Sequence, residues 1–99
     1  MTVFFATLRV KPGQEQQFEK LQRELSSLTH ESESGTIVYD VVRLRDRTGY
    51  YAVYARFKDQ AAFEFHQATP FHDRLVPPIL ECLDGGVAGM DLAFYDWVG

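Results

Sequence analysis

The segment from Tyr50 to His72 constrains the fold more than any other part of the chain. Its opening letters, YYAVYARF, are mostly aromatic or β-branched and predict a strand. Asp59 follows, and its short acidic side chain can accept the free backbone N–H groups of a helix N-terminus. Thr69 and Pro70 supply a second start signal, an N-cap residue followed by proline at the first helical position. The segment therefore predicts a strand and then a short helix that carries His66 and ends near His72.

The rest of the chain predicts one long helix and three further strands. Residues 2–10, TVFFATLRV, are apolar at nearly every position, which predicts a strand covered on both faces. Residues 14–29 place apolar side chains three or four positions apart, which is the stripe of an amphipathic helix. A strand at 36–43 leads through the polar turn at 45–49 into the strand described above, so these two strands form a hairpin. Residues 87–97 predict the last strand.

Two adjacent prolines interrupt the remaining helical pattern. The pattern runs from Phe71 to Leu83, but Pro77 and Pro78 lack the backbone N–H that a helix interior requires. We therefore expect a short turn over residues 70–76 and a second turn that begins at the prolines.

The resulting order of elements is β-α-β-β-α-β. This order predicts an α+β fold of the ferredoxin-like type, a single domain over residues 1–99 with four antiparallel strands and both helices on one face. Large side chains such as Tyr39, Tyr54 and Phe94 nevertheless occupy both sides of the strands. A monomer rarely exposes so large an apolar patch. We therefore expect a homodimer in which two sheets pack face to face as a dimeric α+β barrel.

Composition narrows the classes of partner. The chain of 99 residues carries a net charge of −4, which argues against nucleic acid or an anionic membrane as the main partner. Cys82 is the only cysteine, and no Cys or His pair stands at metal-ligand spacing, so neither a disulfide framework nor a metal site is expected. We find no signal-peptide pattern at the N-terminus and no apolar run long enough to span a bilayer. The expected location is the cytoplasm.

Three short motifs are familiar from one family of proteins. They are Glu33-Ser34-Gly35 followed by Tyr39, the strand exit from Tyr54 to Asp59, and Ala62-x-x-x-His66 followed by Thr69-Pro70. On these residues, and over nearly its whole length, the chain resembles the antibiotic-biosynthesis-monooxygenase-like family of dimeric α+β barrels. The His-x-x-Thr-Pro segment is also similar to the branch that processes a phosphorylated quorum signal. The sequence departs from the family at Ala55, where relatives often have a glutamate.

The resemblance implies oxygenation of a phenolic or quinol-type small molecule without flavin, haem, metal or other cofactor. Such a substrate supplies the electrons itself once it is deprotonated, so the protein needs a base, a dry aromatic pocket and hydrogen-bond donors. His66 is the candidate base. Tyr39 and Tyr54 are the other candidate catalytic residues, because their hydroxyl groups can orient a phenolic ring. A structural histidine and two packing tyrosines are the alternative interpretation of these three residues.

Three further side chains are candidates for substrate binding, and three functions stay open. The binding candidates are Thr7, His72 and Arg56. The leading function is a cofactor-independent monooxygenase. An isomerase or other proton-transfer enzyme acting on a small carbonyl compound would need the same groups. A non-catalytic barrel that binds a small ligand is the third hypothesis, which the alanine at position 55 keeps open. We expect the pocket between the sheet and the helices, near His66 and the strand that carries Tyr54.

Overall fold

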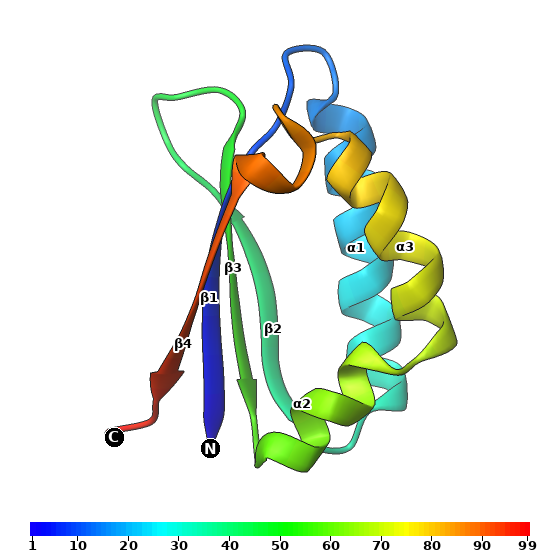
Figure 1. The fold of residues 1–99 in the computed structure, drawn as a ribbon, viewed down its shortest axis with the longest axis vertical. Helices are drawn as coiled ribbons and strands as arrows, with labels where there is room; N and C mark the ends of the chain where they lie inside the picture. Colours follow the sequence, from blue (N-terminus) through cyan, green and yellow to red (C-terminus); the bar gives the residue numbers. More distant parts are fainter.

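The computed structural model describes all residues from 1 to 99, as one four-stranded antiparallel sheet with helices on one side (Figure 1). In chain order the elements are β1 (Thr2–Arg9), α1 (Glu15–Ser32), β2 (Thr36–Arg43), β3 (Tyr50–Phe57), α2 (Gln60–Gln67), α3 (Pro70–Glu81), the 3-10 helix η1 (Gly86–Gly89) and β4 (Met90–Asp96). The strands lie in the order β2-β3-β1-β4, and each neighbouring pair is antiparallel. The predicted ferredoxin-like α+β fold is confirmed, and both hairpin strands have the predicted bounds.

The two faces of the sheet have different surroundings. On β3, Tyr51, Val53, Ala55 and Phe57 are buried toward the helices, and the residues between them point to the opposite side. Figure 1 shows α1 and α3 side by side over one face, with no element over the other. We call this second side of the sheet the outer face. Because side chains alternate along a strand, each strand residue points either toward the helices or toward the outer face.

The core lies between the sheet and the helices and is rich in aromatic rings. Phe4 of β1 stacks on Phe57 at 6.1 Å between ring centroids and meets Phe63 of α2 edge-on at 6.1 Å. At the other end, Phe18 of α1 packs on Tyr51 at 4.6 Å. These contacts bury the apolar stripe of α1 against the sheet, as the spacing of its residues predicts. No helix is both long and apolar enough to span a membrane.

The predicted break at the two prolines is wrong, because α3 runs without interruption from Pro70 to Glu81. Pro77 and Pro78 cannot donate hydrogen bonds to the preceding turn. The carbonyl groups that lose these bonds belong to Asp73 and Arg74, which are exposed residues, so water can take the place of the missing donors. The buried face of α3 continues on both sides of the prolines and keeps the helix on the core.

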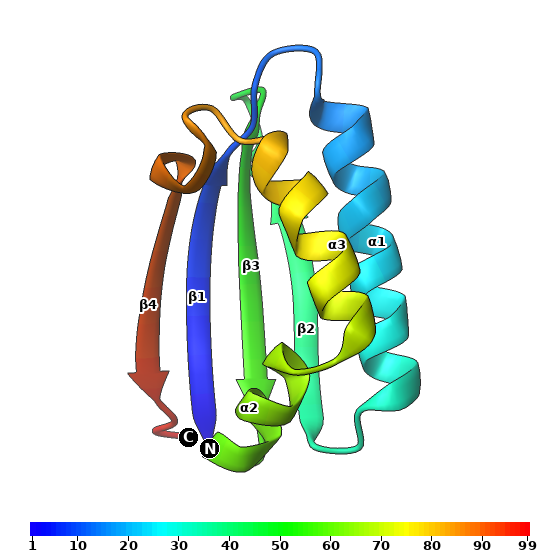
Figure 2. The ribbon, with the colours of Figure 1, turned by 45° about the vertical axis from the view of Figure 1, so that its right-hand side comes forward.

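The last strand is shorter than predicted and lies at the edge of the sheet. Residues 86–89 form η1, and β4 begins only at Met90. A Cβ atom on Gly89 would lie 2.5 Å from the carbonyl oxygen of Asp84, so the chain can turn this tightly only without a side chain. Figure 2 shows α1 and α3 over the β2–β3 half of the sheet, with β4 at the far edge. Consequently Leu92 and Phe94 remain about half exposed on the helix side.

Candidate functional site

A cavity of about 230 Å³ lies between the sheet and the helices. We call it the helix-side cavity. Most of its wall is apolar, and β4 contributes one side through Met90 and Leu92. The polar side chains that line it are Gln22, Tyr39, His66, Gln67 and His72. This volume is below the range typical of drug-sized ligands, so the cavity suits a small molecule of one or two rings.

The chain around His66 is held by two helix caps. The Asp59 carboxylate accepts the backbone N–H of Ala62 at 2.8 Å and fixes the start of α2, as predicted. Thr69 caps α3 by accepting the N–H of His72, and its hydroxyl donates to the carbonyl of His66 at 3.0 Å. The short helix is therefore fixed at both ends, and His66 lies in its last turn with its side chain directed into the core.

His66 forms a buried pair with Glu33, the residue that ends α1. The His66 Nδ1 atom lies 3.0 Å and 2.9 Å from the two carboxylate oxygens of Glu33. Only 2% of the His66 side chain and 1% of the Glu33 side chain are exposed. The hydroxyl of Thr36 donates a further hydrogen bond to Glu33 at 2.7 Å. Such a shielded carboxylate needs these donors, because a buried charge without partners is very costly.

The pairing with Glu33 determines which nitrogen of His66 is free. A carboxylate only accepts hydrogen bonds, so Nδ1 must carry a proton. Nε2 makes no hydrogen bond within the chain, and the His66 side chain lines the helix-side cavity. In neutral imidazole, this Nε2 atom carries the lone pair. The geometry therefore presents a proton acceptor to the cavity.

Tyr39 lies beside His66 and offers a hydrogen-bond donor, whereas His66 offers a proton acceptor. Their ring centroids are 5.2 Å apart, and Tyr39 is buried on the helix side of β2. Burial, reinforced by the negative charge of Glu33, raises the pKa of Tyr39 far above its usual range. The phenol therefore keeps its proton and is available as a hydrogen-bond donor.

The imidazole ring of His72 packs against that of His66. The His66 and His72 rings meet edge-on at 4.9 Å between centroids, and His72 is half-buried at the start of α3. Burial and the nearby charge of His66 lower the pKa of His72, although Asp73 and Glu33 oppose the shift. His72 is therefore biased toward its neutral form. No group of three His, Cys, Asp or Glu side chains is placed to hold a metal ion.

The chain matches a known family over most of its length. The family model described as antibiotic biosynthesis monooxygenase matches residues 1–77. The chain belongs to this family. The matched range contains every motif on which the resemblance was based, together with Glu33, Tyr39, His66 and His72. At the level of the family the chain is monooxygenase-like.

Solved structures agree with this assignment. A crystal structure named antibiotic biosynthesis monooxygenase has a TM-score of 0.84 and 26% identity, with full coverage of both chains. A structure from Caulobacter crescentus CB15 with the same family name has a TM-score of 0.90 and 23% identity, over 99% of this chain and 90% of that one. The structure of a conserved protein from Methanosarcina mazei Go1 has a TM-score of 0.85 and 24% identity, over 95% of this chain and 89% of that one. No curated protein sequence matches the chain.

The family fold separates the predicted site residues into two groups. Tyr39, His66 and His72 meet at the helix-side cavity. Tyr54 does not join them, because β3 directs it to the outer face, whereas its neighbours Val53 and Ala55 point into the core. Of the two candidate tyrosines, only Tyr39 therefore lies beside His66, and the cause is the two-residue alternation of the strand.

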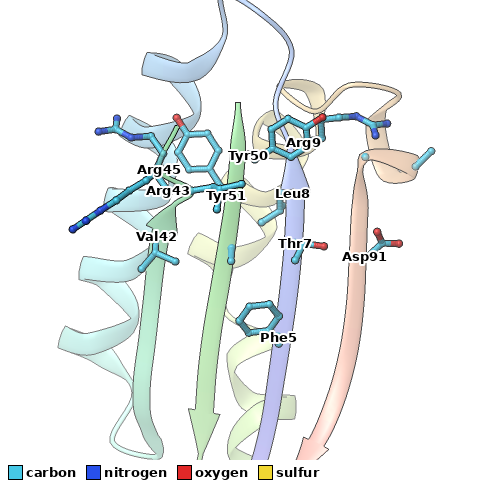
Figure 3. A pocket seen from close by; sticks show the side chains of 14 residues that line it. Phe5, Thr7, Leu8, Arg9, Val42, Arg43, Arg45, Tyr50, Tyr51 and Asp91 are labelled. Atoms are coloured by element: carbon cyan, nitrogen blue, oxygen red, sulfur yellow. The ribbon is translucent and has the colours of Figure 1, made fainter. Parts of the chain in front are cut away.

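Thr7 and Arg56 also lie on the outer face. Thr7 borders a hollow of about 600 Å³ near the hairpin, and Figure 3 shows the side chains around it arising from all four strands. Arg56 stacks its guanidinium over the ring of Trp97 at 3.9 Å. Neither residue reaches the helix-side cavity. In this structure they are therefore part of the outer face and have no contact with His66.

Sequence reasoning missed Glu33 as the partner of His66 and Gln22 as a buried residue of the cavity wall. Glu33 entered only as one letter of a family motif, although an acid directly before Ser34-Gly35 at a helix end was a usable signal. Gly35 matters to this pairing, because a Cβ atom there would lie 2.6 Å from the Cβ of Ala62 on α2. Gly35 thus lets the loop that holds Glu33 approach the helix that holds His66. Gln22 was hidden because it occurs within the polar letters of an amphipathic helix.

We expect Glu33→Ala to destabilise the protein by about 3 kcal/mol or more, because it leaves a buried imidazole N–H without an acceptor. The free energy of unfolding in urea measures this. Glu31→Ala is the matched control, since Glu31 is an exposed residue near the end of the same helix and its loss should change stability by about 0.5 kcal/mol or less. Equal stability of the two variants would contradict the buried pair.

Proposed function

We propose that the protein is a monooxygenase that acts on a small phenolic or quinol-type compound in the helix-side cavity and uses His66 as its base. The observation that carries this proposal is the Glu33–His66 pair, which fixes a proton on Nδ1 and leaves Nε2 facing an aromatic cavity beside a protonated tyrosine. Membership of the antibiotic biosynthesis monooxygenase family supports the reaction class.

In the proposed reaction, Nε2 of His66 removes the proton of a substrate hydroxyl group. Glu33 stabilises the imidazolium that forms, and the Tyr39 hydroxyl donates a hydrogen bond to the substrate oxygen. His72 can then receive the proton and pass it toward the cavity mouth. The apolar wall strengthens these interactions because it keeps competing water away.

The electron balance of the proposed reaction closes without another reductant. A quinol with a free ring position reacts with one O₂ to give a hydroxyquinone and one water. One oxygen atom enters the ring, and the other leaves as water with two protons. The substrate supplies all four electrons. The protein therefore has to manage only protons and position, which are the tasks that the residues of the cavity can perform.

The paired imidazoles also favour a second candidate, a proton-transfer enzyme acting on a small carbonyl compound. Two histidines whose ring centroids are 4.9 Å apart could remove a proton at one carbon and return it at another. Oxygen uptake with quinols supports the first candidate. Exchange of solvent deuterium into a ketone, without oxygen uptake, supports the second.

We further propose that the working unit is a homodimer whose outer faces pack together. Large apolar side chains on this face are substantially exposed in one chain: Phe5, Val42, Tyr95 and Trp97. A patch of this kind commonly marks an interface. Tyr54, Thr7 and Arg56 would then contribute to the dimer and to its buried hollows rather than to the chemistry at His66.

For the proposed base, we expect His66→Ala to lower turnover of a responsive quinol by about 10²–10⁴-fold, the usual contribution of a positioned base. Oxygen uptake per folded molecule is the measurement, with circular dichroism to confirm folding. His30→Ala is the control, because His30 is exposed and does not line the cavity. Full activity in a folded His66→Ala variant would remove His66 from the mechanism.

For the proposed dimer, we expect the wild-type protein to sediment as a dimer at micromolar concentration and Phe5→Asp to sediment as a monomer. A charge at Phe5 would be buried at the centre of the interface, which is costly. Phe65→Asp is the matched control, because Phe65 is also an exposed phenylalanine but lies on α2, away from the outer face. A wild-type monomer, or a dimer that only Phe65→Asp disrupts, would contradict the proposal.

A further inference from the structure

The helix-side cavity contains one buried polar group that the proposed chemistry does not use, because Gln67, which also lines the cavity, is an exposed residue. Gln22 is only 4% exposed and lies on the buried face of α1 in line with Phe18 and Leu25. Its Oε1 atom is fully enclosed and has no hydrogen-bond partner, and its Nε2 atom makes no hydrogen bond within the chain. Two other buried atoms lack a partner, on Thr29 and Arg56, but neither residue lines this cavity.

An enclosed amide oxygen without a partner is unfavourable for the free protein. Burial of a polar group is normally compensated by a hydrogen bond, and an apolar residue of similar size would fill the same place without this cost. A group of this kind in a cavity wall is explained if a ligand supplies the missing partner. The amide therefore indicates a hydrogen-bonding group on the ligand.

The position of Gln22 places this contact away from His66. Gln22 and Glu33, the C-cap of α1, are eleven positions apart, which corresponds to about 16 Å along the helix axis. Gln22 lines the helix-side cavity, and His66, the partner of Glu33, lines it as well, so one ligand can contact both residues. The space between them is lined by apolar and aromatic side chains such as Val53 and Phe4. The cavity thus has two polar ends and an apolar middle.

We infer that Gln22 is a specificity-determining residue that binds a second hydroxyl group of the substrate, on the side of the ring opposite the hydroxyl that His66 deprotonates. The ligand class is a small one- or two-ring aromatic compound with hydroxyl groups at opposite ends. A hydroxyl is the fitting partner, because it can donate to Oε1 and accept from Nε2 of the same amide. This inference rests on the proposed function for the placement of the reacting hydroxyl at His66.

The inference predicts a preference that binding alone can measure. The probes are 2,6-dihydroxynaphthalene and 2-naphthol, which differ only in the far hydroxyl, and calorimetry gives their Kd values. We expect the wild-type protein to bind the diol about tenfold or more tightly, because 2-naphthol leaves the amide unpaired. In Gln22→Leu the ratio should fall to about one, while Tm stays equal to or above that of the wild type. Gln17→Leu, on the exposed side of the same helix, should keep the wild-type ratio.

Each other outcome counts against the inference. Equal binding of the two probes by the wild type, no measurable binding of either, or an intact preference in Gln22→Leu would overturn it. A large fall in Tm would also overturn it, because the amide would then be structural. Gln22→Met repeats the test with an unbranched side chain if Gln22→Leu does not fold.

The test is separable from that of the proposed function. A His66→Ala variant should keep the diol preference even where no oxygen is consumed. Diol preference without any oxygen uptake by the wild type would refute the oxygenase and leave the role of Gln22 standing. Oxygen uptake without diol preference would refute the role of Gln22 and leave the oxygenase standing.

Discussion

The contact between Glu33 and His66 is the interaction on which the rest of the site depends. It joins the end of α1 to the last turn of α2 across 33 residues of sequence, and both side chains are almost completely shielded from solvent. The caps at Asp59 and Thr69 and the close approach at Gly35 all act on the segments that make this contact. A buried carboxylate is unfavourable unless it is fully paired. Here the buried carboxylate of Glu33 also orients the imidazole of His66. Burial, together with the negative charge of this carboxylate, raises the pKa of the neighbouring Tyr39 phenol.

The sheet separates two environments that share one set of strands. Residues on the helix side form the cavity with a proton acceptor at Nε2 of His66 and a hydrogen-bond donor at Tyr39. Residues on the outer face are apolar and exposed, with Arg56 over Trp97 near one end and the arginines of the hairpin near the other. Neighbouring residues of a strand point in opposite directions. A substitution of Tyr54 therefore alters the outer face, whereas a substitution of Val53 alters the core on the helix side. This separation allows the outer face to vary without disturbing the side chains that line the helix-side cavity.

Local signals in the sequence predict most of the fold. The stripe of α1, the caps at Asp59 and Thr69, and the bounds of β2 and β3 all follow from short-range chemistry. The predictions are wrong where tertiary packing overrides a local preference: the buried face of α3 carries the helix through Pro77 and Pro78, and the turn at Gly89 delays β4. The site was only half predictable. His66, Tyr39 and His72 are recognisable from their residue types, whereas the partnership with Glu33 depends on contacts between distant segments. The placement of Tyr54 required the sheet register, which sequence alone leaves ambiguous by one residue.

The tautomer of His66 is the property that tests this account most directly. In a proton–nitrogen correlation spectrum of protein with isotope-labelled histidine, the account predicts that the neutral form of the His66 ring carries its proton on Nδ1 and has a bare Nε2. Spectra of His30 and His72 variants would assign the three histidine signals. A proton on Nε2 with a bare Nδ1 would contradict the account, because Glu33 could not then accept from the ring and no lone pair would face the cavity.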